Sequence, residues 1–473
     1  MSQSREKRLH VWLLMAGTLS LATFSAFAAE EALQKVADEA VDDQVADSET
    51  VADSNRALVV FVDKPVPMVE GEEPYFPPVE AIVIPQNEVE GTSQLQSINQ
   101  FNLAIQQQEN EGGAWNSALV ETLNGLGNLQ QQLQNHSEAL STFDRAIHIS
   151  RINNGLHTAD QLPMVGEIIE SHLALGNWEQ ADLYHGYRFY VQQKAYGSSD
   201  PRIIPVLTDL GKWNMRAFSI GYGDALGLRL STAQIAFNAA YRLLSTHFEP
   251  TDERVIPFLH NIASSAFQAA IHPGLINDID RPEYLMEQDD FRRMLEEEGS
   301  SVPRGFGPGE EALLEIVAFH QEAGSPPRIL AQAMADLADW YLIFGRRRDA
   351  EALYLETWNF LGEQENASEL QAELFATAIP IPTFDRTPRL INYRGSERPD
   401  RGQLSAGYGD FIFEVSRTGE ARRVEIVNEE SVENSGQLQR VARELRRNYF
   451  RPVLQEGVPV TTENNRVRIR FWY

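Results

Sequence analysis

A fixed spacing of leucine, small and aromatic residues recurs along the middle of the chain and limits how it can fold. Leu126-Gly127 is followed by Ala139, twelve residues after the glycine, and then by Phe143 and Ala146. Residues three or four positions apart lie on one face of a helix, and small residues let two helices approach closely. An aromatic ring then fills the adjoining gap. The spacing predicts two short antiparallel helices, which form the unit of a helical solenoid.

Three further stretches carry parts of the same spacing. Their matching residues are Gly176 with Ala181; Gly211 with Ala233, Phe237 and Ala240; and Gly345 with Ala350 and Tyr354. The stretches are unevenly placed, so we expect longer helices or extended loops beside a regular repeat of roughly 34 residues.

This pattern resembles the tetratricopeptide repeat family, whose first helix carries a Leu-Gly pair. The second helix of that family carries alanine, an aromatic residue and alanine at the intervals seen after Gly127. The resemblance implies a solenoid over residues 94–378 that binds other proteins. It also implies that the thirteen glycine, alanine and aromatic residues named above from Gly127 to Tyr354 pack the repeats.

A less regular helix pair is expected at residues 255–270 and 310–323. A charged loop at 278–309 would join them, ending in Gly305-Phe306-Gly307-Pro308-Gly309. This glycine-rich stretch lacks the Lys-Ser/Thr that completes a phosphate-binding loop. It is therefore interpreted as a flexible connection.

The last part of the chain changes in composition and in local pattern. Residues 394–473 contain 14 arginines and no lysine against 12 acidic residues, whereas the chain as a whole has a net charge of -28. Apolar residues alternate at 411–415, 423–427 and 467–472, which predicts strands. An amphipathic helix is predicted over 437–449 and ends before Pro452. The fold class predicted for the whole chain is thus mainly α, with a helical solenoid followed by a small α+β domain of order ββαβ.

This second region, 406–473, resembles the C-terminal domain of TonB, the periplasmic energy transducer. The matching pieces are the turn at Gly419, Phe450-Arg451-Pro452 after the helix, Gly457-Val458-Pro459-Val460, and an aromatic final strand. TonB's long proline-rich spacer has no counterpart here. The resemblance implies the fold of this domain and a role in the cell envelope.

Arg468, Arg470 and Trp472 lie on the predicted final strand. The two arginines alternate with apolar residues, so we expect them to point away from the core. One interpretation is that they are edge charges that discourage aggregation. The other is that the edge accepts a peptide by β-augmentation. The resemblance to TonB implies the second, because the comparable edge there engages a short segment of an outer-membrane receptor.

The first 28 residues are typical of a secretory signal peptide. Arg5, Lys7 and Arg8 precede an apolar stretch, and Ala26-Phe27-Ala28 places small residues before a cut at Ala29. Retention as an inner-membrane anchor is the alternative, because the apolar stretch is barely long enough to span a bilayer. Residues 29–93, acidic and then proline-containing, are predicted to be a disordered or extended linker with a short β-type run at 58–62. The proline-containing part, 64–90, is interpreted either as an extended linker or as an irregular strap over the next domain. Residues 379–405 are predicted to be a second linker.

Composition excludes several classes of function. The chain has no cysteine, which excludes disulfides and thiolate sites, and its negative charge disfavours nucleic acid. No histidine spacing of a familiar metal site and no nucleophile elbow is present. We therefore expect no metal, no cofactor and no enzyme activity.

The leading functional hypothesis is a periplasmic adaptor that binds other envelope proteins or peptides. The alternative is a TonB-like transducer with its N-terminus retained in the inner membrane. A third hypothesis, an enzyme or assembly factor acting on cell-wall material, would need converging carboxylates that the sequence does not reveal. The sequence does not specify the oligomeric state.

Overall fold

A computed structural model gives the arrangement of the chain. It describes residues 59–69, 73–76, 91–223, 225–249, 252–275, 291, 293, 305–391, 404–427 and 435–473. The predicted signal peptide, its cleavage site at Ala28 and Ala29, and the acidic stretch up to residue 58 lie outside the described residues.

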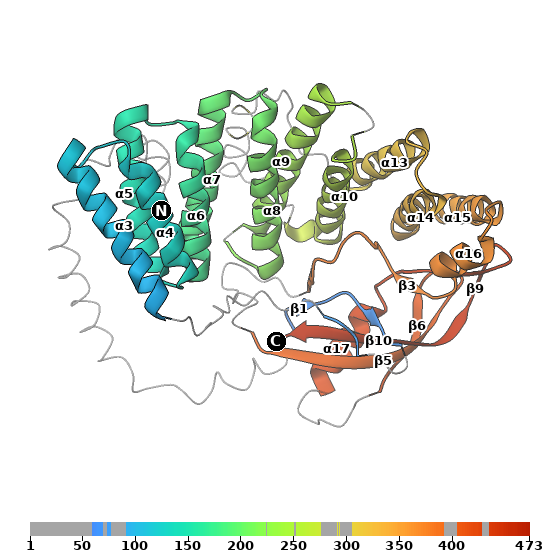
Figure 1. Ribbon diagram of the computed structural model, residues 1–473. Coiled ribbons are helices and arrows are strands. Elements are labelled where there is room, and N and C mark those ends of the chain that lie inside the picture. Colours follow the sequence, from blue (N-terminus) through green and yellow to red (C-terminus); the bar gives the residue numbers. More distant parts are fainter. Residues whose placement is uncertain are drawn as a thin grey trace, which may run out of the picture. The chain divides into compact units, whose positions relative to one another are not determined.

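The described residues form five helix pairs, with α3 (Gly91–Gly112) before them and α16 (Ala367–Phe375) after them (Figure 1). The pairs are α4 (Leu119–Gln132) with α5 (His136–Asn154), α6 (Leu162–Ala174) with α7 (Trp178–Tyr196), α8 (Ile204–Ile220) with α9 (Leu226–His247), α10 (Val255–Ile271) with α13 (Phe306–Glu322), and α14 (Pro327–Ile343) with α15 (Arg347–Gly362). Each pair contacts the next one along the chain. The predicted helical solenoid is confirmed.

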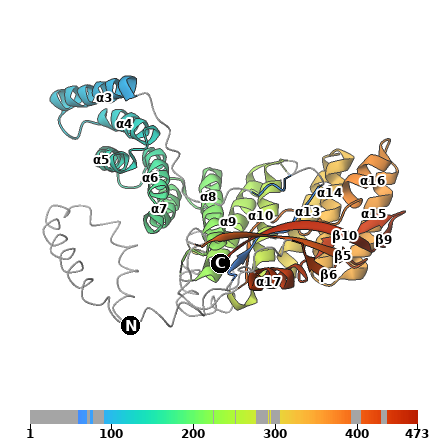
Figure 2. The same ribbon diagram turned by 90° about the horizontal axis from the view of Figure 1, so that it is seen from below.

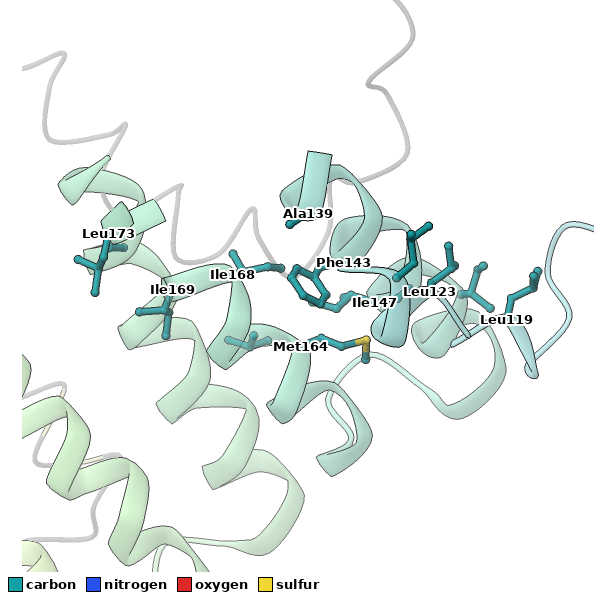
Figure 3. Close-up of a cluster of buried hydrophobic side chains, with 14 of the residues drawn as sticks. Leu119, Leu123, Ala139, Phe143, Ile147, Met164, Ile168, Ile169 and Leu173 are labelled. Carbon is teal, nitrogen blue, oxygen red and sulfur yellow. The ribbon is translucent and has the colours of Figure 1, made fainter. Parts of the chain in front are cut away.

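Apolar residues at helical spacing bury one face of each helix. Leu119 and Leu123 of α4 pack with Phe143 of α5 and with Ile168 of α6 in one cluster (Figure 3). Leu126 of α4 belongs to the same cluster. Burial of this kind contributes about 25 cal/mol for each Å² of apolar surface removed from water. Most of the stability of such short helices comes from this packing.

The C-terminal part forms a small α+β domain. It contains β5 (Ala406–Val415), β6 (Ala421–Ile426), α17 (Ser435–Leu445), β7 (Phe450–Arg451), β8 (Val453–Gln455), β9 (Val458–Val460) and β10 (Thr462–Trp472). Strands β5, β6 and β10 with α17 keep the predicted ββαβ order, and β8 and β9 add a separate hairpin. The small α+β domain of the predicted fold class is confirmed.

Two segments predicted as linkers contribute strands to this domain. The main sheet has the order β4-β1-β10-β5-β6, with β2 also beside β10. Strands β1 (Phe61–Val62) and β2 (Val66–Pro67) come from the first predicted linker, and β4 (Arg389–Leu390) comes from the second. Strand β3 (Ile379–Pro380) pairs with β7. The β-type run predicted at 58–62 is confirmed by β1. The linker prediction was wrong for β2, β3 and β4, because the strands that pair with them lie far away in the sequence.

The glycine-rich stretch at 305–309 is also not a flexible connection. Helix α13 begins at Phe306, and Pro308 is tolerated because the first turn of a helix leaves its N–H groups unpaired. A Cβ atom on Gly309 would lie 2.1 Å from the Trp340 ring of α14. Glycine is therefore required there for close helix packing.

Candidate functional site

The predicted repeat-packing residues meet at the helix crossings. A Cβ atom on Gly127 would lie 2.5 Å from the ring of Phe143, and one on Gly211 would lie 2.5 Å from the ring of Phe237. Both distances are far below van der Waals contact, so only glycine fits beneath each ring. The glycine of the Leu-Gly pair on the first helix and the later aromatic residue on the second helix therefore contact each other.

The other residues of the pattern lie in the cores and turns of the pairs. Ala139, Ala146, Ala181, Ala233, Ala240, Ala350 and Tyr354 are buried. Gly176 and Gly345 have φ angles of 74° and 76° in the turns between α6 and α7 and between α14 and α15. Glycine takes this left-handed conformation without the strain that a side chain would add.

The second half of the solenoid packs against the chain's own α+β domain. Phe218 of α8 and Leu226 and Leu230 of α9 form a cluster with Phe61 of β1 and Trp472 of β10. Figure 2 shows β5 and β10 running along the later helices, while α3 to α5 stand away from them. The helices from α8 onward are therefore partly occupied by the C-terminal domain.

A buried ionic cluster joins the domain to α14. Arg451 of β7 donates from Nε to Oδ1 of Asp339 at 3.0 Å and from Nη2 to Oδ2 at 2.7 Å. Its Nη2 also donates to Asp336 Oδ1 at 3.1 Å. Tyr354 donates to Asp339 and Thr383 donates to Asp336. Burial raises the pKa of Asp336 to about 6, against the opposing effect of Arg451.

A second buried cluster joins the N-terminal strands to α10. Lys64 donates to the backbone carbonyls of Pro382 and Asp385. The carboxylate of Asp385 accepts hydrogen bonds from Ser264 and Gln268 of α10. Burial lowers the pKa of Lys64 to about 8, although the neighbouring carboxylates act in the opposite direction. Separating either cluster would leave a buried charge without its partners, which is energetically costly. We therefore interpret both clusters as parts of a permanent interface.

The strand that carries Arg468, Arg470 and Trp472 has a neighbour on each side. β10 pairs with β5 on one side and with β1 and β2 on the other. Trp472 is 1% exposed. The edge predicted to accept a peptide is thus occupied by the chain's own residues in this structure.

The two arginines have internal partners. Arg468 donates to Asp410 from Nε at 2.6 Å, and Arg470 donates from Nε to Asp63 at 2.7 Å. Arg470 also lies over the ring of Phe76. The expectation that Arg470 faces solvent was wrong: it points away from the core, as the alternation predicted, but Asp63 and Phe76 cover it.

An uncovered polar face remains on the first two helix pairs. We call Glu121, Asn124 and Asn128 of α4, with Glu167 and Glu170 of α6, the open face. These residues lie at helical spacing opposite the buried side of each helix. The two helices are neighbours, because Gln131 Nε2 donates to the Glu167 carbonyl oxygen at 2.7 Å and to Ser171 Oγ at 2.8 Å.

The open face is acidic. Residues 91–196 carry ten acidic and four basic side chains. Two of those basic groups are engaged in ion pairs, Arg145 with Glu109 and Arg188 with Asp209. The side-chain oxygens of Asn124 and Asn128 are buried beneath this face and have no hydrogen-bond partner among the described residues. Sequence reasoning missed this face, although the spacing of its polar residues opposite the leucines was a visible signal.

Two features are absent from the part of the chain that the structure describes. No group of three or more His, Asp or Glu side chains there could hold a metal ion. No helix among the same residues is long and apolar enough to cross a membrane.

Comparison with known proteins gives likenesses in fold only. No family model matches the sequence, and no curated protein matches it. A solved structure described as a kinesin light chain with nearly identical TPR-like repeats, from Podosopora anserina, is 16% identical, with a TM-score of 0.34 over 54% of this chain and 96% of that one. BtubC from P. vanneervenii is 13% identical, with a TM-score of 0.33 over 64% of this chain and 96% of that one. The helix pairs themselves establish the TPR-like repeat fold, and these distant likenesses add nothing about partners.

Proposed function

We propose that this protein is an exported scaffold that binds other envelope proteins through its helical repeats. One observation carries the proposal: the solenoid is divided into a half that holds the chain's own α+β domain and a half whose open face is uncovered. Solenoids of stacked helix pairs offer extended surfaces that bind proteins or peptides. The proposal assigns the protein no catalytic role.

The partner of the open face would be a basic or neutral segment of another protein. Glu121, Glu167 and Glu170 have no ion-pair partner among the residues that the structure describes. Carboxylates of this kind steer a basic segment toward the surface and orient it.

Export to the periplasm is part of the proposal and rests on the signal-like first 28 residues. The TonB-like domain is the second part, and it would supply a further contact with an envelope component. A specific observation also keeps the transducer as a second candidate: β1, close to the N-terminus, pairs directly with the C-terminal strand β10. A retained N-terminal anchor would therefore attach to the TonB-like domain without passing through the solenoid.

The mass of the native protein and its cell fraction separate these two candidates. A chain that begins at Ala29 in the soluble periplasm supports the scaffold. A full-length chain in the inner membrane supports the transducer.

Co-purification tests the binding surface itself. Reversing charge on the open face with Glu121→Lys and Glu170→Lys should release a partner that co-purifies with the unaltered chain. The matched control, Glu311→Lys and Glu351→Lys, changes two exposed residues on α13 and α15 and should retain it. A partner that stays bound to the open-face variant, or leaves both variants equally, contradicts the proposal.

A further inference from the structure

The helix pairs α6–α7 and α14–α15 match in register. The last residue of α6 precedes the last residue of α14 by 169 positions, and the first residues of α7 and α15 are separated by the same number. Each turn contains a glycine with positive φ, Gly176 at 74° and Gly345 at 76°. Five positions after each glycine, the second helix buries an alanine, Ala181 or Ala350, completely. Every residue of α6 therefore has a counterpart in α14 that lies 169 positions later.

The first helix of each pair carries two acidic residues at the same place in this register. Glu167 and Glu170 of α6, which we call the α6 acid pair, correspond to Asp336 and Asp339 of α14, the α14 acid pair. The residue after the first acid is aliphatic and buried in both helices. The two acid pairs therefore lie at the same angle to the core of their helix pair. The Leu-Gly helices α4 and α8 have at most one acidic residue at the corresponding positions.

The α14 acid pair shows which ligand this arrangement can bind, because it holds an arginine of the chain itself. Nη2 of Arg451 donates to Asp336 Oδ1 at 3.1 Å and to Asp339 Oδ2 at 2.7 Å, and Nε donates to Asp339 Oδ1 at 3.0 Å. One planar guanidinium thus contacts both carboxylates of a helix at once. Arg451 reaches them from the short strand β7, which is an extended segment.

The α6 acid pair lies open to a ligand of the same kind. Glu170 is exposed and Glu167 is half-buried. Neither side chain forms an ion pair among the residues that the structure describes. A Cβ atom on the adjacent Gly166 would meet no atom within 4 Å, so the surface beside the pair is unobstructed. Glutamate is also longer than aspartate, which extends both carboxylates away from the helix.

We propose that Glu167 and Glu170 bind an arginine side chain of the partner protein, as Asp336 and Asp339 bind Arg451. The inference rests on the proposed function, because it names the residue by which the open face recognises its partner. The partner residue is arginine rather than lysine, since the guanidinium presents several donors in one plane whereas an ammonium is a compact point charge. The arginine would lie in an extended segment, which brings it to the helix as β7 brings Arg451.

A synthetic peptide of residues 448–454, with both ends blocked, is the probe. It contains Arg451 in its own sequence context, and isothermal titration calorimetry at low ionic strength measures its binding to full chains. The α14 acid pair is filled by the chain's own Arg451, so the peptide reports on the α6 acid pair. We expect saturable binding to the unaltered chain. A peptide with Arg451→Lys should bind about tenfold more weakly, because it loses at least one charge-assisted hydrogen bond.

Charge neutralisation in the chain locates the site. Glu167→Gln with Glu170→Gln should weaken binding of the arginine peptide by at least about tenfold. The matched control, Glu138→Gln with Glu179→Gln, removes two charges from exposed positions on α5 and α7 and should retain the affinity of the unaltered chain. The proposal is overturned if the unaltered chain shows no saturable binding, if it binds the arginine and lysine peptides equally, or if both variants lose affinity alike.

This result is separable from the test of the scaffold function. A partner that is released by charge reversal of the open face, while the arginine and lysine peptides bind equally, leaves the scaffold in place and removes the arginine site. A partner that stays bound after charge reversal, while the peptide still distinguishes the variants, removes the proposed function and leaves an arginine site on α6.

Discussion

The guanidinium of Arg451 and the carboxylate of Asp339 form a two-bond ion pair that is fully buried. They are separated by 112 positions in the sequence and link β7 of the α+β domain to α14 of the solenoid. A pair of this kind fixes orientation, because each bond requires both planar groups to face each other. The α+β domain and helix α14 of the solenoid therefore meet in one interface at this ion pair.

Replacing Arg451 should destabilise the protein strongly. Arg451→Met leaves Asp336 and Asp339 buried without their cation, and breaking such a pair costs about 3–5 kcal/mol. Arg328→Met is the matched control, because Arg328 is paired with Glu373 and both side chains are exposed; such pairs contribute about 0–1 kcal/mol. Urea unfolding of both variants measures the difference. Equal losses would contradict a structural role for the buried pair.

Glycine substitutions test the helix crossings. Gly127→Ala forces a Cβ atom into the ring of Phe143, and overpacking of this kind costs about 1–3 kcal/mol. Gly166→Ala in α6 is the control, because a Cβ there meets nothing within 4 Å. Alanine at that position should stabilise the helix by up to about 1 kcal/mol. Thermal unfolding should therefore shift in opposite directions for the two variants, and a shift in the same direction would refute the packing argument.

The N-terminal strands β1 and β2 should contribute to global stability through their pairing with β10. Phe61 of β1 is 1% exposed, and truncating a buried phenylalanine to alanine costs about 3–5 kcal/mol. Tyr75→Ala, at a residue that is 73% exposed, should change the free energy of unfolding by less than about 0.5 kcal/mol. A Phe61→Ala variant as stable as Tyr75→Ala would mean that β1 does not hold its place in solution.

Acid should weaken the interface through His272. Burial lowers the pKa of this histidine from 6.5 to about 4, and its Nδ1 lies 2.9 Å from the Gln268 carbonyl oxygen. The folded state then binds fewer protons than the unfolded state between pH 4 and 6.5. The stability that the neutral ring contributes is therefore present above pH 6.5 and is lost as pH falls toward 4.

The His272→Gln variant isolates this contribution. The lowering of the His272 pKa from 6.5 to about 4 corresponds to a loss of about 3 kcal/mol in the free energy of unfolding across this pH window. The variant should lose less stability than the unaltered chain between pH 6.5 and 4.5, measured by urea unfolding. Asp336→Asn should act in the opposite sense, because the raised pKa of Asp336 stabilises the fold at low pH and that contribution is lost as pH rises through about 6. Parallel pH profiles for all three proteins would contradict both assignments.

Local patterns carried enough information to predict the helix pairs and the ββαβ order. The Leu-Gly pair and the later aromatic residue act within one hairpin, so their spacing is visible along the sequence. The strands of the α+β domain alternate in polarity over five or six residues, which is also a local signal. Both kinds of element are determined by neighbours a few turns away.

The pairing of residues 59–67 with β10 and the buried charges could not be predicted in the same way. The apolar run from Val59 to Val62 predicted a short β-type segment, but not its partner. β1 and β2 are two-residue strands beside prolines, and their partners on β10 lie about 400 positions later. Asp336, Asp339 and Arg451 have the residue types of a solvated surface, and only the fold brings them together.

Site-specific photocrosslinking in cells tests the central claim most directly. A crosslinking amino acid at Asn128 on the open face is compared with one at Leu314, which is 46% exposed on α13. The account predicts that Asn128 yields a distinct crosslinked band containing a second protein, and that Leu314 yields none at the same mass. The same band from both positions, or no band from either Asn128 or Glu170 of the open face, would contradict a scaffold whose first two helix pairs bind its partner.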